Sequence, residues 1–394
     1  MLTALLLASV LQEPKYENTD YGIRLRIPPG WNIDGARQAR VILKITSGGE
    51  YLVRPEILVY EIPFSEPITL MQYKELVRHN IQRTYKDPLM LDDRQGEAGG
   101  RAGFFLEVRS KGTTDADVVS IKGVFQRSPR RMIGVDGFFP AGKEGELRKI
   151  YDGILASLEF IPRKKPDGLD AGVKDIQDAL KSRPGPAAPP AAVQELGIFT
   201  GDKQVGTYRV EIRQAAGGEE LSTRTKIDLG EDGRVDTSVT GFLSNDLATQ
   251  NVEVVEIKVS KDKRTQNFSA KVALAAGEVT AERRINGEPY AARFPAPHGT
   301  VLAELLELLQ ARLVGPQKKL FLLPMAAAYD DETGLAKIEL GGLHKMKEGE
   351  TTSEVFVSHL VRDEGAVMTY WHGADRQLQR VSAANQSFVI RRLK

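Results

Sequence analysis

Histidine and cysteine, the residues that most often act as general bases, nucleophiles and metal ligands, are scarce in this sequence. Its 394 residues include 5 histidines and no cysteine, which excludes disulfides, thiol nucleophiles and cysteine-ligated zinc or iron–sulfur sites. Four histidines lie in the second half, and no two of them are three or four residues apart, as a metal-binding pair on a helix requires. These four are His298, His344, His359 and His372. His359 and His372 could meet across a hairpin, but histidine is common on strands without any metal, so we predict no metal site, no cofactor and no catalytic residue.

Three short patterns match known site signatures only in their letters. The acidic run 330–332 lacks the alternate-residue ligand spacing of a calcium loop, so turn chemistry is the simpler explanation. Ser260 and Lys263 have the S-x-x-K spacing, but they fall in a charged turn between strands, where no helix begins. The glycines within 96–103 are not followed by a Lys-Ser or Lys-Thr pair, so they indicate a glycine-rich hairpin and not a phosphate-binding loop.

The charge pattern argues against a nucleic-acid partner. The chain has 54 Lys and Arg against 53 Asp and Glu, a formal net charge of +1, and no aromatic stripe alternates with basic residues. The one compact basic cluster, Arg127, Arg130 and Arg131 around Pro129, is expected to be a solvated loop; contact with an anion or an anionic lipid is the less favoured alternative. We predict no nucleic-acid binding and at most peripheral association with a membrane.

The first residues indicate the compartment. Residues 1–11 carry an apolar run of about ten residues, which is shorter than the roughly 20 that span a bilayer and matches the core of a secretory signal. We interpret residues 1–12 as a signal peptide and expect an exported protein, periplasmic or extracellular. A buried N-terminal helix is the alternative, because no basic residue precedes the run and no A-x-A cleavage site follows it.

A proline-rich segment divides the chain. With 41% hydrophobic and 27% charged residues, the composition is that of an ordinary globular protein, and 394 residues suggest two or three domains. Residues 163–193 begin with a basic cluster and contain prolines too closely spaced for a core helix or a central strand. We predict this segment to be a linker between domains at 15–162 and 194–394, with a marginally stable helix at 173–181 and an extended spacer at 184–192.

The first domain alternates strand and helix signals. Thr69 and Gln72 form a capping box, followed by apolar residues at helical spacing to about Tyr85. A second helix has its apolar face on Leu147, Ile150, Tyr151, Ile154, Leu155 and Leu158. Alternating apolar residues predict strands at 21–27, 40–46, 51–62, 104–109, 118–127 and 131–139. This order predicts an α+β domain in which helices cover an antiparallel sheet.

Two groups of residues frame this first domain. Tyr21-Gly22-Ile23 leads into Pro29-Gly30-Trp31 at its start, and Ser157-Leu158-Glu159-Phe160 closes it. With them, residues 15–162 resemble the PsbP/Mog1/DcrB-type fold. The framing residues are strand ends and core-filling side chains, so the resemblance implies the fold, a PsbP/Mog1-like antiparallel sheet covered by helices. It also implies the role that most such proteins share, a binding or assembly module without obvious catalytic residues.

The second domain is a succession of strands separated by hairpin signals such as Asn286-Gly287. Strands are predicted at 208–213, 221–229, 235–242, 252–260, 267–274, 278–285, 335–340, 352–361, 366–371, 377–381 and 388–392. This regular spacing implies a large, curled antiparallel sheet. Residues 299–314 break the pattern with a Leu-rich helix, expected to be capped by Thr300 and ended by Gly315-Pro316. Because apolar residues cover more than half of its circumference, the helix must be buried, most simply in the concave side of the sheet.

The C-terminal hairpin carries a second resemblance. Thr369-Tyr370-Trp371, a turn at Gly373-Ala374-Asp375 and the strand 376–381 are similar to the last hairpin of exported half-barrel proteins of the LolA/LolB lipoprotein-carrier type. The resemblance covers residues 194–394 and implies a curved sheet with helices that plug an apolar cavity. It assigns no lipid-binding residue in this sequence.

Two functions of different class follow. The first is a non-catalytic exported binding or assembly protein whose half-barrel holds an apolar ligand or a partner segment; the Leu-rich helix would either line that site or simply fill the core. The second is an enzyme with a carboxylate-based site in the concavity of the half-barrel. We favour the first, because no catalytic arrangement is recognisable. Its candidate apolar contacts are Val301, Leu302, Leu305, Leu306, Leu309 and Leu313.

Overall fold

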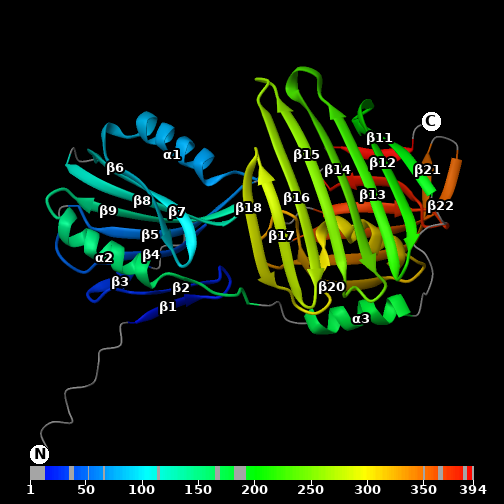
Figure 1. Cartoon of the computed structure of the whole chain (residues 1–394), viewed down its shortest axis with the longest axis horizontal. Helices are drawn as coiled ribbons and strands as arrows, with labels where there is room; N and C mark the ends of the chain where they lie inside the picture. The colour runs from blue at the N-terminus through cyan, green and yellow to red at the C-terminus, as the bar shows by residue number, and fades with distance from the viewer. Residues whose placement is uncertain are drawn as a thin grey trace, which may run out of the picture. The chain divides into compact units, whose positions relative to one another are not determined.

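The computed structural model of the chain divides into two compact units, Met1–Lys165 and Pro166–Lys394. It describes residues 14–34, 40–51, 53–64, 67–112, 116–164, 169–181, 192–348, 351–362, 367–384 and 388–392. The predicted signal peptide at 1–12 and nearly all of the predicted spacer at 184–192 lie outside these residues. Each unit is built on its own large sheet (Figure 1).

The first unit is built on a seven-stranded antiparallel sheet in the order β3-β4-β5-β9-β8-β7-β6. Successive residues of β7 point to opposite faces, so Phe104 and Leu106 pack with α1 (Leu70–Thr84), whereas Phe105 packs in the cluster of α2 (Glu144–Ser157). The predicted α+β arrangement is confirmed. The strands are β1 (Lys15–Asn18), β2 (Ile23–Arg26) and β10 (Glu159–Phe160), which form a small sheet, and β3 (Trp31–Ile33), β4 (Val41–Ser47), β5 (Glu56–Pro63), β6 (Lys86–Ala98), β7 (Arg101–Lys111), β8 (Asp117–Ser128) and β9 (Arg131–Pro140).

The capping box of α1 is formed as predicted. The backbone N–H of Gln72 donates to Thr69 Oγ1 at 3.1 Å, and the backbone N–H of Thr69 donates to Gln72 Oε1 at 2.9 Å. Two backbone donors that the start of a helix would leave unpaired are thereby satisfied within four residues of sequence. The helix begins where the sequence indicates because both partners are local.

Thr69→Ala is expected to lower the free energy of unfolding of the first unit by about 1 kcal/mol, because it removes the N-cap acceptor. Guanidinium denaturation followed through Trp31 fluorescence, in a Trp371→Phe background, measures this change. Thr69→Ser retains the hydroxyl and is the matched control. Equal losses in the two variants would contradict a capping role.

The glycine-rich segment is a hairpin turn, as predicted. Ala98 pairs with Arg101 across it, and Gly99 and Gly100 have φ values of 58° and 72°. Glycine adopts this left-handed backbone without a steric cost, which a two-residue hairpin loop requires. The strand that leads into the turn, β6, shows no clear alternation of apolar residues and is not predicted from the sequence, since its side chains are mostly exposed.

The second unit is dominated by one fifteen-stranded sheet whose order runs linearly from β18 through β11 and β25 to β19, so the sheet is open. Its strands are antiparallel except for the parallel pair β19 and β20, and its two parts meet at β11 and β25. The large antiparallel sheet is thus present as predicted, whereas its curling into a half-barrel stays a prediction. The strands are β11 (Ala192–Thr200), β12 (Lys203–Ala215), β13 (Gly218–Asp228), β14 (Gly233–Ser244), β15 (Gln250–Ser260), β16 (Thr265–Ala275), β17 (Glu278–Ile285), β18 (Glu288–Pro295), β19 (Val301–Leu302), β20 (Lys319–Ala326), β21 (Gly334–Glu348), β22 (Thr351–Arg362), β23 (Val367–His372), β24 (Leu378–Ala383) and β25 (Val389–Arg392), with a 3-10 turn η1 (Gly230–Asp232) between β13 and β14.

Helix α3 (Leu169–Lys181) belongs to the second unit, although it falls within the predicted linker 163–193. Val173 and Ile176 are buried, and Gly172 lies so close to the Leu322 carbonyl of β20 that a Cβ at this position would clash. The helix predicted at 173–181 is thus present and begins at Leu169; although such a helix is marginal on its own, this one is supported because its apolar face packs on the sheet. In the part of the chain that the structure describes, no helix is long and apolar enough to cross a membrane.

The Leu-rich segment 301–314 is not the single helix that was predicted. Residues Val301–Leu302 form β19, Ala303–Leu305 form a 3-10 turn (η2), and α4 spans only Leu306–Leu313. Thr300 does not cap it; its hydroxyl donates to the Pro297 carbonyl at 2.6 Å. The break arises because Val301 pairs with Met325 of β20, a partner that helical periodicity cannot show.

Candidate functional site

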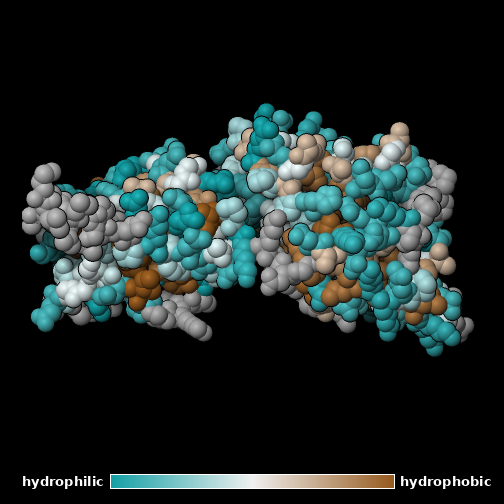
Figure 2. Space-filling view, turned by 90° about the horizontal axis from the view of Figure 1, so that it is seen from below, coloured by the Kyte–Doolittle hydropathy of each residue, from teal (hydrophilic) through white to brown (hydrophobic). Residues whose placement is uncertain are grey.

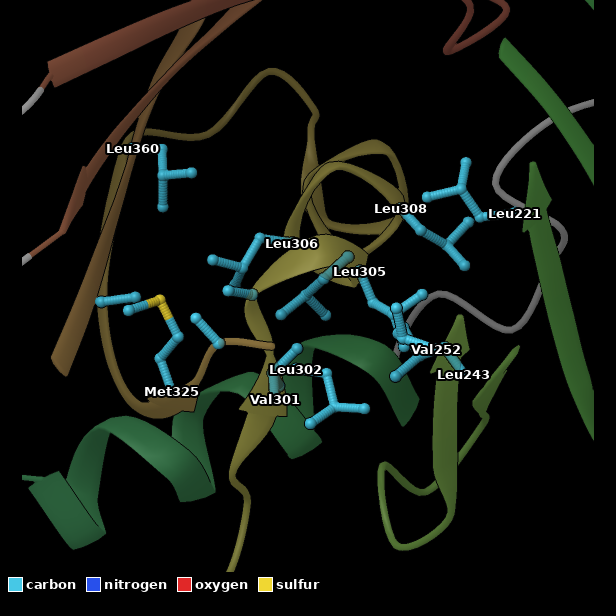
Figure 3. Close-up of a cluster of buried hydrophobic side chains, with 14 of the residues drawn as sticks. Leu221, Leu243, Val252, Val301, Leu302, Leu305, Leu306, Leu308, Met325 and Leu360 are labelled. Carbon is cyan, nitrogen blue, oxygen red and sulfur yellow. The ribbon is translucent and has the colours of Figure 1, made fainter. Parts of the chain in front are cut away.

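The residues predicted to contact an apolar ligand all lie in the core of the second unit. They are 0–1% exposed: Val301, Leu302, Leu305, Leu306, Leu309 and Leu313. Figure 3 shows Leu243 and Val252 approaching the segment from one part of the sheet and Leu360 facing it from the other. Both parts of the open sheet therefore pack against one continuous segment.

A small cavity adjoins α4. The cavity beside it has a volume of about 10 Å³, which is room for one water molecule. The lining is mixed polar and apolar: Gln194, Val210, Ile212, Glu307, Ala311, His372, Arg376, Gln377 and Leu378. We call this cavity the Glu307 chamber. The apolar side chains of the segment pack against protein atoms, and their contact with an apolar ligand stays a prediction.

Glu307 and His372 line the Glu307 chamber, and a tyrosine lies next to each of them. Glu307, in the first turn of α4, accepts a hydrogen bond from the Tyr208 hydroxyl of β12 at 2.6 Å. His372 of β23 is 1% exposed, and its Nδ1 has no hydrogen-bond partner among the described residues. Its ring is stacked near that of Tyr370, with centroids 6.4 Å apart. Of these four, only His372 is a candidate from the sequence, because nothing in the spacing connects the others.

Burial controls the ionisation of these groups. Loss of solvent raises the pKa of Glu307 to about 7, against the effect of the Tyr208 hydrogen bond. Burial lowers the pKa of His372 to about 4, so its imidazole is neutral at pH 7. Burial, and then the neighbouring Glu307 carboxylate, raise the pKa of Tyr208 and of Tyr370. Between about pH 4 and about pH 7 these side chains are uncharged, and above this range Glu307 gains a negative charge.

Glu307→Gln is expected to stabilise the second unit at alkaline pH and to change it little near pH 5. The folded-state pKa of about 7 lies above the ordinary value of 4.5, so the folded protein holds a proton that the unfolded chain has lost. Wild-type stability therefore falls by about 2–3 kcal/mol as the pH rises from about 4.5 to about 7. This is less than the full effect of the pKa shift, because residual solvent contact screens part of it. Glutamine keeps an acceptor for Tyr208 and cannot ionise.

Urea denaturation between about pH 5 and about pH 9, followed through Trp371 in a Trp31→Phe background, measures this difference. His372 has the opposite linkage, with stability lost as the pH falls from 6.5 to about 4, and it cancels because both proteins contain it. Glu231→Gln, in the exposed turn η1, is the matched control. A difference between variant and wild type that is constant over the pH range would contradict the assignment.

The two glutamates of the segment do not converge on one site. Glu304 accepts a hydrogen bond from the backbone N–H of Ala328, after β20, at 3.0 Å, whereas Glu307 bonds to Tyr208 of β12. Burial raises the pKa of Glu304 as well. A general acid and a general base have to face the same bound atoms. This segment therefore does not place two carboxyl groups together, as the alternative of a carboxylate-based enzyme requires.

The histidines of the second unit lie at separate places. Polar partners are Gln177 for His298, the Gly341 carbonyl for His344 and Thr369 for His359. In the hairpin of β22 and β23, His359 lies opposite Thr369 while His372 lies opposite Phe356, so the two histidines are not paired. Among the residues that the structure describes, no three potential metal ligands gather.

The acidic run 330–332 lies in the connection between β20 and β21, in keeping with its interpretation as a turn. Asp331 forms a buried ion pair with Arg283 of β17 at 2.6 Å and accepts a hydrogen bond from the Tyr290 hydroxyl of β18. Arg283 also donates to the carbonyls of Ala328, at 2.6 Å, and Asp330. We call this arrangement the Arg283 clamp. The sequence does not indicate that Asp331 is buried, because the cation that makes its burial possible is distant along the chain.

The remaining two patterns have different outcomes. Ser260 and Lys263 lie in the exposed turn between β15 and β16, in keeping with their interpretation as turn residues. Arg127, by contrast, is 4% exposed, donates to the Tyr21 carbonyl and lies over the Phe160 ring at 5.8 Å. The expectation of one solvated basic loop is therefore wrong for Arg127, since its guanidinium packs under the small sheet.

A larger hollow lies on the opposite side of β12 from the Glu307 chamber. It is an open groove of about 510 Å³, lined by Glu211, Arg213, Glu220, Leu221, Ser222, Thr240, Gly241, Phe242 and Asn251. We call it the outer groove. Because side chains alternate along a strand, Val210 and Ile212 line the chamber while Glu211 and Arg213 line the groove. The sequence alone does not indicate the groove, since alternating polar residues are typical of any solvated strand face.

Exposed apolar side chains are scattered over the surface. In the view of Figure 2, hydrophobic residues form separate patches within a largely hydrophilic face. Large exposed examples include Ile33, Leu76, Leu89, Leu320 and Leu343. Some exposed apolar residues are normal in globular proteins and need no ligand to explain them.

No protein-family model and no curated protein matches the chain. Similar solved structures include cyanobacterial PsbP (CyanoP) from Synechocystis sp. PCC 6803, at 15% identity over 40% of this chain and 98% of that chain, with a TM-score of 0.29. LpqN, involved in cell envelope biogenesis of Mycobacterium tuberculosis, is 12% identical over 38% of this chain and 91% of its own, with a TM-score of 0.32. A beta-barrel-like protein of domain of unknown function DUF1849 from Brucella abortus is 14% identical over 52% of this chain and 94% of its own, with a TM-score of 0.36. They include a PsbP, the fold type that residues 15–162 resemble, and a beta-barrel-like protein.

Proposed function

We propose that this protein is an exported, non-catalytic accessory protein of the cell envelope, periplasmic or extracellular, that binds a ligand or partner at its surface. One observation carries the proposal. The Leu-rich segment 301–314 is packed into the core of the second unit, while the outer groove offers about 510 Å³ of open space. A filled interior leaves the outside of the sheet as the place for binding.

In this proposal the fifteen-stranded sheet acts as a half-barrel and the segment 301–314 as its plug. Hydrogen bonds connect α4 to both parts of the sheet. Arg312 pairs with Glu219 of β13 and donates to the Leu243 carbonyl of β14 at 3.0 Å. Gln310 accepts a hydrogen bond from the Ser358 hydroxyl of β22 at 2.9 Å. Such a plug supports a fixed scaffold whose shape does not depend on a ligand inside.

The Glu307 chamber supports the non-catalytic part of the proposal. It has room for one water molecule, which is too small for a substrate. Its shifted pKa values follow from burial in a packed core and need no catalytic role. The resemblance of residues 15–162 to PsbP/Mog1-like modules, which act by binding, agrees with this interpretation.

An apolar ligand or partner segment inside the half-barrel is the other form of binding. It would require the segment 301–314 to leave the sheet, which would expose Leu305 and Leu306 together. Native mass spectrometry of the purified full chain separates the two forms. Our proposal expects the mass of the polypeptide alone. A lipid that co-purifies with the protein would overturn the filled interior and favour the displaced segment.

Cell fractionation tests the location. The full chain with a C-terminal epitope should reach the periplasm or the medium, with its mass reduced by removal of about the first twelve residues. A variant with Leu5→Arg and Leu6→Arg should stay in the cytoplasm, because charges interrupt the apolar run. Wild-type protein that stays in the cytoplasm at full mass would contradict export.

A further inference from the structure

The outer groove is built from side chains that face one another across four strands. One row consists of Arg213, Glu220, Phe242 and Asn251, on β12, β13, β14 and β15 in turn. The next row consists of Glu211, Ser222 and Thr240. Residues two apart on a strand share a face, so both rows project to the same side of the sheet. The groove is thus a composite surface that only correct strand register assembles.

The floor of the groove carries hydroxyl groups. Ser222 and Thr240 are register partners, which places their short side chains next to each other. Each hydroxyl can donate one hydrogen bond and accept two, and Asn251 at the end of the other row adds an amide with both functions. The centre of the groove therefore offers donors and acceptors that carry no charge.

Phe242 supplies an apolar wall. Its ring is only partly buried. It is the apolar residue in a row of polar ones, because Ser238 and Thr240 lie on the same face of β14. A Cβ on Gly218 would lie 2.7 Å from Phe242 Cζ, so the ring lies directly over the glycine backbone of β13. Glycine leaves room for one face of the ring, and the ring is thereby fixed as a flat surface at the edge of the groove.

The charges that line the groove disfavour an anionic ligand. Arg213 is the one cation among its lining residues, and it is already paired with Glu211 at 2.5 Å. Glu220 is exposed and adds a carboxylate. A phosphate or carboxylate ligand would meet a net negative lining, whereas a neutral polar ligand meets hydrogen-bonding groups without repulsion.

We propose that the outer groove is a binding site for a neutral saccharide. A sugar ring has an apolar face of C–H groups, which packs on an aromatic ring, and a rim of hydroxyls, which pair with hydroxyl, amide and carboxylate groups. Phe242, Ser222, Thr240 and Asn251 present these partners on one surface. The volume of about 510 Å³ is that of an ordinary small-ligand site. This inference rests on the proposed function, for which it names the site and the ligand class.

Isothermal titration calorimetry of the full chain tests the site, with maltohexaose, cellohexaose and xylohexaose as neutral probes and an oligogalacturonate as the anionic probe. At least one neutral probe should bind, and the anionic probe should not. Phe242→Ala should weaken binding at least tenfold and Thr240→Val several-fold. Ile257→Ala is the matched control, because Ile257 is 43% exposed on β15 and lies outside the groove; it should leave the affinity unchanged.

Circular dichroism of each variant shows whether it is folded, and Phe242→Leu replaces Phe242→Ala if the latter unfolds. Failure of all neutral probes to bind, binding that Phe242→Ala and Thr240→Val leave unchanged, or tighter binding of the anionic probe or of a mixed peptide library would overturn the assignment. If the calorimetry gives one of these results while the protein is exported and carries no co-purified ligand, the saccharide site is wrong and the proposed function still holds. Cytoplasmic retention or a co-purified lipid removes the proposed function itself.

Discussion

Replacing Arg283 with methionine is expected to lower the free energy of unfolding of the second unit by about 3–5 kcal/mol, the range for breaking a buried ion pair from one side. The side chains of Arg283 and Asp331 are 0% and 3% exposed. Methionine occupies a similar space but cannot donate, so the Asp331 carboxylate and the carbonyls of Ala328 and Asp330 lose a donor inside the core. The expected loss is large because the stranded carboxylate is charged.

The Arg283 clamp connects strands that lie near opposite ends of the open sheet. Arg283 lies on β17, next to one end of the open sheet, and Asp331 follows β20, next to the other end. A stacked pair reinforces the connection: Phe268 of β16 lies on Tyr329 with ring centroids 4.3 Å apart. Strands far apart in the sheet order are thus tied together through side chains and not through backbone pairing.

Guanidinium denaturation of the full chain in a Trp31→Phe background, with Trp371 as the probe, measures the Arg283→Met effect. Arg284→Met is the matched control: it changes the next residue, which is exposed, and should cost less than about 0.5 kcal/mol. Asp331→Asn and the double variant complete a cycle with an expected coupling of about 2 kcal/mol. Additive losses would show that the two residues do not act as a pair.

Leu306→Ala is expected to cost about 3–4 kcal/mol of stability in the second unit. Leu306 is 0% exposed and lies between Leu360 and the inner residues of the segment (Figure 3). Removing its side chain loses burial and leaves a cavity that the surrounding sheet cannot fill without moving. The same result is not expected for a leucine that lines open space, where no packing contacts are lost.

This variant therefore tests directly whether the Leu-rich segment is a core or the wall of a ligand site. It is measured by the same denaturation experiment, with Leu343→Ala as the matched control, since Leu343 is 48% exposed on β21. A loss below about 1 kcal/mol for Leu306→Ala would contradict the packed interior and favour a site for an apolar ligand beside this segment.

Elements with local causes are the ones that the sequence predicts well. The capping box of Thr69 and Gln72 places the start of α1, and Gly99-Gly100 gives a hairpin turn. Most strands of both sheets also follow from alternation. Strands β6, β11, β18 and β20 are among those that the sequence does not predict. In some of them the apolar residues do not alternate over a long enough run, and others contain prolines, which are not typical of a strand interior.

The Leu-rich segment shows where this reasoning fails. Its composition correctly predicts burial, but the change from strand to 3-10 turn to helix depends on β20. The sequence does not predict the chamber or the groove for a related reason. Glu307 and the residues of the outer groove are ordinary helix or strand residues in the sequence, and only strand register brings them together with the other residues that line the chamber or the groove.

By itself, the sequence determined the α+β class, the large antiparallel sheet, the start of α1, the turns and the absence of cysteine chemistry. These features depend on composition or on residues close together in the chain. Only the tertiary structure decided that Asp331 and Arg127 are buried, that α3 packs on the second sheet, and that the interior around α4 is filled. The physical reason is distance along the chain: Arg283 and Asp331 are 48 residues apart, Arg312 and Glu219 are 93 residues apart, and a charge can be buried only where such a partner arrives.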